Sequence, residues 1–126
     1  FKGEMTVLKT VVLKENIRKE IGKIQSVRFG KDGYQDACIG VSFTLGSDKE
    51  CWGVGDFWGA WAIERSDHCK WTEADRIKQL GEMVMRLNAL MEDAKVENVA
   101  QLAGIPVEVT FDSNTLKDWR VLTEVI

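Results

Sequence analysis

The sequence predicts an α+β fold: an antiparallel sheet of about five strands packed against one long helix. Two observations predict it. Two segments of alternating apolar and small or polar residues have the pattern of strand hairpins, one before and one after a long stretch with helical periodicity. The expected order is therefore strand, strand, strand, helix, strand, strand. With 126 residues of ordinary globular composition, the chain is expected to form a single domain over residues 1–126.

The first 18 residues stand apart from the predicted core at 19–126. Residues 6–13 are rich in valine and predict a weak strand, at a sheet edge or paired with another subunit. Met5 is a candidate natural start, and the residues before it are interpreted as additions to the natural chain. No charged leader followed by an apolar segment is present, and no apolar run is long enough to span a membrane.

Three cysteines, Cys38, Cys51 and Cys69, are widely spaced and odd in number, which predicts neither a disulfide framework nor a metal site. No dinucleotide or phosphate-loop motif occurs either, so no cofactor is expected. Together these patterns favour a cytoplasmic protein in a reducing compartment.

The first three strands are predicted at 20–29, 36–46 and 50–57. In the second, residues 37, 39, 41, 43 and 45 are apolar, so this face is expected to be core. The opposite face of the hairpin has Gly40, Ser42, Gly53 and Gly55, with almost no side chain to pack. Something must therefore approach the backbone closely there. The domain's own helix and a bound ligand, base or partner chain are both candidates.

The helix is predicted over 72–94, with a capping box formed by Thr72 and Asp75. Its apolar stripe consists of Ile77, Leu80, Val84, Leu87, Met91 and Ala94, widened by Met83 and Leu90. A helical turn at 96–102 and a closing hairpin of strands near 107–111 and 118–126 follow. This order of elements fits an open sheet with a packed helix and also a partly rolled barrel like the OB-fold.

The segment 51–61 combines aromatic residues and glycines, which makes it the candidate contact surface. Its candidate partner-binding residues are Trp52, Asp56, Phe57, Trp58 and Trp61. Aromatic rings among glycines can stack on bases, so the leading hypothesis is a non-enzymatic module for single-stranded nucleic acid. Burial of the same rings in the core is the alternative.

Charge is distributed unevenly along the chain, whose net charge is −3. Residues 1–31 carry eight basic and three acidic residues, and the remainder carries nine and seventeen. The candidate contacts to a nucleic-acid backbone are Lys19, Lys23, Arg28 and Lys31. Attraction between two faces of the protein, within a monomer or a homo-oligomer, is the preferred explanation of the asymmetry, because the overall acidic balance repels a phosphate backbone.

Two further functions are alternatives. One is an inhibitor or modulator that binds a host protein, with the acidic surface attracting a basic site. The other is a small enzyme using Asp56, Glu64 and His68, since acid–base chemistry needs a group that titrates near neutrality. No catalytic motif accompanies these three residues, so an enzyme is not the expected function.

Three parts of the chain resemble small uncharacterised proteins encoded by tailed bacteriophages and prophages. The matching segments are Gly33-Tyr34-Gln35-Asp36-Ala37, residues 52–59, and residues 106–111 with 119–123. The resemblance spans about residues 19–126. That family has no assigned reaction, so no residue role is carried over from it. The resemblance implies a bacterial cytoplasm and an accessory protein, of the kind that aids nucleic-acid metabolism or inhibits a host system.

Overall fold

The computed structural model describes residues 16–126, whose strands form one five-stranded antiparallel sheet. The strands are β1 (Ile17–Asp32), β2 (Cys38–Ser47), β3 (Trp52–Trp61), β4 (Pro106–Asp112) and β5 (Thr115–Val121). The helix α2 (Glu73–Ala94) lies between β3 and β4, and short 3-10 turns occupy Tyr34–Asp36, Val99–Leu102 and Thr123–Val125. The described residues thus contain the expected five-stranded antiparallel sheet and one long helix. The strand predicted at 6–13 lies outside them.

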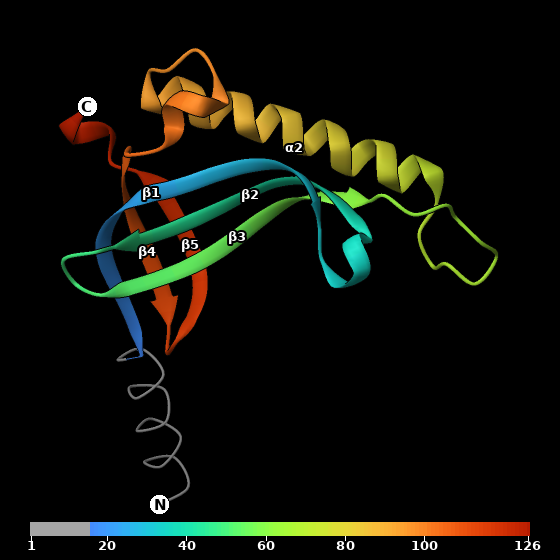
Figure 1. Cartoon of the computed structure of the whole chain (residues 1–126), viewed down its shortest axis with the longest axis horizontal. Coiled ribbons are helices and arrows are strands. Elements are labelled where there is room, and N and C mark those ends of the chain that lie inside the picture. The colour runs from blue at the N-terminus through green and yellow to red at the C-terminus, as the bar shows by residue number, and fades with distance from the viewer. Residues whose placement is uncertain (1–15) are drawn as a thin grey trace, which may run out of the picture.

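The long first strand organises the sheet, whose spatial order is β3-β2-β1-β4-β5. Residues 23–32 of β1 pair with β2, and residues 17–23 pair with β4. A bulge lies between Ile24 and Ser26, where the register with β2 shifts. The backbone of Ile24 also hydrogen-bonds Gly104 and Ile105 in the segment that leads into β4. The bent strand turns the two halves of the sheet toward each other (Figure 1).

The sheet is not closed into a barrel, which corrects one of the two expected architectures. Within residues 16–126, no hydrogen-bonded ladder joins the edge strands β3 and β5. Side chains meet across this gap instead: the indole rings of Trp58 and Trp119 stack with their centroids 5.6 Å apart. The interior of the roll is filled by apolar side chains, including Ile24, Val41, Phe43, Leu45, Leu102, Val107, Val109 and Phe111.

The capping box predicted for α2 is confirmed. The amide of Asp75 donates to the Thr72 hydroxyl at 3.1 Å, and the Thr72 amide donates to the Asp75 carboxylate at 2.8 Å. The helix ends at Lys95, whose left-handed conformation has φ 58°.

Only part of the predicted apolar stripe of α2 is buried. Met83, Leu90 and Ala94 join the core, whereas Ile77 and Val84 are 69% and 57% exposed. Met83 and Arg86, on either side of Val84, face β3, so Val84 points away from the sheet. The N-terminal part of the helix extends past the end of the strands (Figure 1). No helix in the described part of the chain is long and apolar enough to cross a membrane.

The C-terminal turn is attached to β5 by an ion pair that should be visible in a pH titration. Arg120 donates to both carboxylate oxygens of Glu124, at 3.0 and 2.9 Å. These hydrogen bonds lower the pKa of Glu124 from 4.5 to about 2. A depressed pKa means that the stabilisation is present above pH 4.5 and is lost as the pH falls through about 2.

We therefore expect the NMR carboxyl resonance of Glu124 to titrate with a midpoint near 2 in the folded protein. In the variant Arg120→Gln the midpoint should move up toward 4.5, because the donors to the carboxylate are lost. A midpoint that is the same in both proteins would show that this ion pair does not form in solution.

Candidate functional site

Small residues line up across three strands on the outer face of the sheet, the face opposite Val41 and Phe43. Gly30 of β1 pairs with Gly40 of β2, which in turn pairs with Gly59 of β3. We call these three residues the glycine row. Because none has a side chain, the row leaves space over the strand backbones, yet Gly40 is buried and Gly30 and Gly59 are half-buried.

Two flat side chains lie over the glycine row. A Cβ added at Gly59 would sit 2.7 Å from the ring of Phe57, and one added at Gly40 would sit 2.9 Å from it. A Cβ at Gly30 would lie 3.2 Å from Nη2 of Arg28, whose guanidinium donates to the carbonyl of Lys31 at 2.9 Å. Of the predicted glycine face, only Gly40 has a side chain lying close to it, the ring of Phe57, whereas an added Cβ at Gly53 or Gly55 would meet only a carbonyl oxygen at 3.7 Å. The helix packs on the opposite, inner face, so the helix interpretation was wrong.

A fixed negative charge lies beside Arg28. The Ser42 hydroxyl and the Gly33 amide both donate to Asp32. These hydrogen bonds, first of all the one from Ser42, lower the pKa of Asp32 below its ordinary value of 3.8. The carboxylate is therefore ionised at neutral pH, and this part of the outer face presents one positive and one negative group side by side.

A second aromatic group continues the outer face at the end of β3. Trp61 is 40% exposed and stacks on Trp71, with 6.5 Å between ring centroids and 15° between ring planes. The guanidinium of Arg76 lies 4.4 Å from the centroid of Trp71. We call Arg28, Phe57, Trp61 and Trp71 the outer platform.

Two predicted contact residues face the inside of the roll, which corrects their assignment. Trp58 is only 8% exposed, with its ring against Trp119 and the guanidinium of Arg86 4.1 Å from its centroid. Trp52 packs edge-on against Phe111, with ring centroids 5.6 Å apart. Side chains along a strand alternate between its two faces. Because Phe57 points to the outer face, the even-numbered residues Trp52 and Trp58 point to the inner face.

Asp56 also has an internal role. Its Oδ2 accepts the indole N–H of Trp58 at 3.0 Å and that of Trp119 at 2.7 Å, while Oδ1 accepts the amide of Phe57 at 2.9 Å. The carboxylate thus joins the two edge strands of the sheet. It is committed to this bridge and is not positioned to contact a partner.

The four predicted basic contacts are not all on one surface. Lys23 and Arg28 pair with Gly46 and Ser42 on the outer face. Lys19 lies on the half of β1 that pairs with β4, where its ammonium is 3.7 Å from Glu108. Lys31 pairs with Ile39 and so belongs to the other face. Of the four, only Arg28 belongs to the outer platform.

The candidate catalytic trio is not assembled. Glu64 and His68 are exposed in the loop 62–72, whereas Asp56 is bound to the two indoles. Among residues 16–126, His68 makes no ion pair or hydrogen bond with a carboxylate. In the same part of the chain no group of three or more metal-binding side chains is found, and all three cysteines are free. The small-enzyme hypothesis therefore lacks its site.

Comparison with known proteins identifies no homologue of this chain. No family model, curated protein or solved structure matches the chain. The function must therefore be argued from the arrangement of the side chains themselves.

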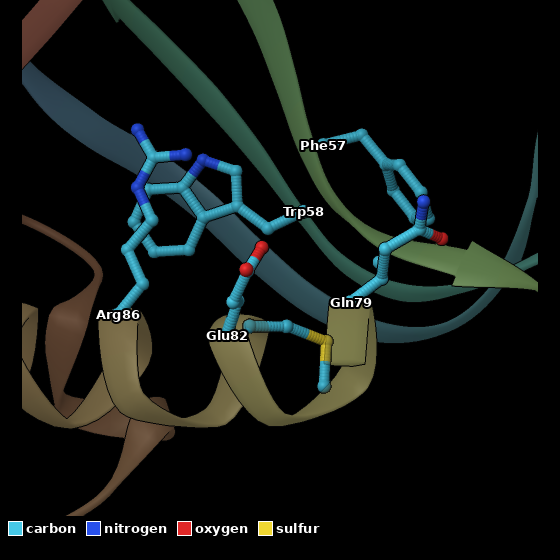
Figure 2. Close-up of a pocket in the computed structure, with 7 residues that line it drawn as sticks. Phe57, Trp58, Gln79, Glu82 and Arg86 are labelled. Carbon is cyan, nitrogen blue, oxygen red and sulfur yellow. The ribbon is translucent and has the colours of Figure 1, made fainter. Parts of the chain in front are cut away.

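A groove runs beside the outer platform, between β3 and α2 (Figure 2). Its volume is about 250 Å³, and it is lined by Phe57, Trp58, Gly59, Gln79, Glu82, Met83 and Arg86. The four helix residues could not be assigned to a site from the sequence, because helical periodicity does not reveal which strand a helix face will meet. The stacking of Trp71 on Trp61 could not be predicted from the sequence either, because it depends on the conformation of the loop between them.

Proposed function

We propose that this protein is a non-enzymatic module that binds single-stranded nucleic acid on the outer platform. The observation that carries the proposal is the glycine row, on which the ring of Phe57 and the guanidinium of Arg28 lie, with Arg28 exposed and Phe57 half-buried. Bases of a single strand stack on aromatic rings and on arginine planes, and each stacked base contributes about 1–3 kcal/mol. Trp61 continues the same face and offers a further ring.

The arrangement of the strands supports the same proposal. We infer that the sheet is a partly rolled relative of the OB-fold, because β1 pairs with both β2 and β4 and the helix lies between β3 and β4. OB-folds bind oligonucleotides on the face of their second and third strands. Phe57 lies on that face here. The proposed setting is the bacterial cytoplasm, where a phage accessory protein would meet single strands.

Binding of a fluorescently labelled oligothymidylate, followed by anisotropy at two salt concentrations, tests the proposal. Phe57→Ala is expected to weaken binding about tenfold through the loss of one stacked base. Arg28→Ala should weaken binding and also reduce the slope of log affinity against log salt by about one.

Matched controls are available on other surfaces. Ile77→Ala removes an exposed apolar side chain from α2, and Lys117→Ala removes an exposed charge from β5. Neither should change the affinity by more than about twofold, since neither lies on the outer platform. The absence of any salt-sensitive binding up to high micromolar protein would rule the proposal out.

A host protein remains the second candidate partner, and one observation favours it. Ile77, Val84 and Met85 form an exposed apolar surface on α2, which is the type of surface that protein partners cover. If affinity capture from a bacterial lysate recovers only the protein itself, this candidate fails. A mass by light scattering above that of one chain would instead indicate self-association, and its loss in Val84→Asp would assign the contact to this surface.

A further inference from the structure

The turn between β1 and β2 presents an aromatic side chain that the outer platform does not include. Tyr34 is 85% exposed, the highest exposed fraction among the large apolar and aromatic side chains of residues 16–126. No residue of the 3-10 turn Tyr34–Asp36 is buried, so packing does not account for an aromatic ring at this position. The ring is therefore available to a binding partner, as is common for residues on connecting loops.

The backbone of this turn is strained. Gln35 has φ 55° and ψ 32°, and Asp36 has φ 55°, so two consecutive residues other than glycine adopt the left-handed region. The amide of Asp36 donates to the carbonyl of Gly33 at 3.1 Å. The amide of Ala37 donates to the carbonyl of Tyr34 at 3.2 Å. These hydrogen bonds hold the turn in a conformation that leaves the Tyr34 ring in solvent, and backbone strain of this kind is concentrated at binding sites.

The turn is attached beside Trp61, at the end of the outer platform. Cys38, the first residue of β2, pairs with Trp61. The carbonyl of the preceding residue, Ala37, accepts the amide of Ala62 at 2.7 Å. Figure 1 shows the turn (cyan) on the side of the sheet away from α2, which is the side of the outer platform. A single strand that lies along β3 from Phe57 to Trp61 therefore reaches this turn next.

We infer that Tyr34 is a further binding residue, whose ring stacks on a base of the bound single strand beyond Trp61. This inference rests on the proposed binding of single strands by the outer platform. Stacking on an aromatic ring accepts any base, since every base has a π-face. The tyrosine ring is uncharged, so it neutralises no phosphate. Tyr34 therefore raises the affinity without changing the salt dependence of binding.

Anisotropy of a labelled oligothymidylate of about twelve nucleotides tests the inference. Tyr34→Ala should weaken binding about tenfold through the loss of one stacked base. The slope of log affinity against log salt should stay as in the wild type, because no phosphate contact is removed. Tyr34→Phe keeps the ring and should bind within about twofold of the wild type.

Phe29→Ala is the matched control for the loss of an exposed ring. Phe29 is 61% exposed and pairs with the buried Val41, so it lies on the inner face of the sheet, away from the outer platform. This variant should keep the wild-type affinity within about twofold. Thermal unfolding followed by circular dichroism checks that all the variants fold.

Photocrosslinking with 5-iodouracil in place of thymine locates the contact. Trypsin cleaves after Lys31 and Lys49, so Tyr34 lies in the peptide 32–49, whereas Phe57 and Trp61 lie in the peptide 50–65. Both peptides should carry the crosslinked strand, and Tyr34→Ala should remove it from 32–49 alone.

The outcomes separate this inference from the proposed function. If Tyr34→Ala binds like the wild type, or if peptide 32–49 carries no crosslink, Tyr34 is not a binding residue but the outer platform stands. Equal weakening by Tyr34→Ala and Phe29→Ala would also contradict the inference, because the loss would then not be specific to this turn. If the wild type binds no oligothymidylate, the proposed function fails, and this inference with it.

Discussion

Replacing Asp56 by alanine is expected to lower the free energy of unfolding by about 3 kcal/mol. The carboxylate accepts the indole N–H groups of both Trp58 and Trp119. Alanine leaves both donors without this partner, and an unsatisfied buried donor costs about 1–3 kcal/mol. Because β3 and β5 share no hydrogen-bonded ladder among the described residues, this bridge is a main link between the two edges.

Urea unfolding followed by tryptophan fluorescence measures the loss. Asp56→Asn is the matched control, because its amide oxygen can still accept from both indoles while its NH₂ group replaces the oxygen that accepts from Phe57. The asparagine variant should lose less than half as much stability as the alanine variant. Equal losses, or a change below about 1 kcal/mol in Asp56→Ala, would show that the bridge does not hold the edges together.

The role of Asp56 shows how far sequence patterns can predict this site. Alternation along residues 36–46 correctly predicted which face of that strand is core, because period two fixes the direction of side chains within a strand. The burial of Trp58 depends instead on its contact with Trp119. Asp56, which accepts a hydrogen bond from both indoles, is 63 residues from Trp119 in the chain. Contacts between distant edge strands leave no local periodic signal, so the sequence could not separate core from contact surface among the aromatic residues.

The helix illustrates a different limit. A 3.6-residue period predicted an amphipathic helix and its capping box, and both are present. It did not predict how much of the helix overlaps the sheet. Ile77 and Val84 belong to the predicted stripe but are exposed, because the buried face of the helix is centred on Met83, Leu90 and Ala94. Similarly, the prediction of a close approach is correct at Gly40 and wrong at Gly53 and Gly55, and the role of Gly59 could be identified only from the strand register.

Gly40→Ala is expected to lower the free energy of unfolding by about 3 kcal/mol, since a methyl group at this position has no space. The added Cβ would overlap the carbonyl oxygen of Trp58 and lie 2.6 Å from the Cα of Gly59. Both obstacles are backbone atoms of the neighbouring strand, so relief requires β2 and β3 to separate. The Phe57 ring, 2.9 Å from the same Cβ, must move as well.

Gly55→Ala is the matched control on the same face. Its Cβ would meet only the carbonyl oxygen of Phe43, at an ordinary contact distance of 3.7 Å. Chemical denaturation should therefore show a change within about 0.5 kcal/mol. The two variants separate two roles of glycine. At position 55 the glycine only leaves a strand surface without a side chain, whereas at position 40 it allows the backbone of β3 and the Phe57 ring to lie close to β2. Equal stability of the two variants would contradict the proposed geometry of the outer platform, because Phe57 could then not lie over the glycine row.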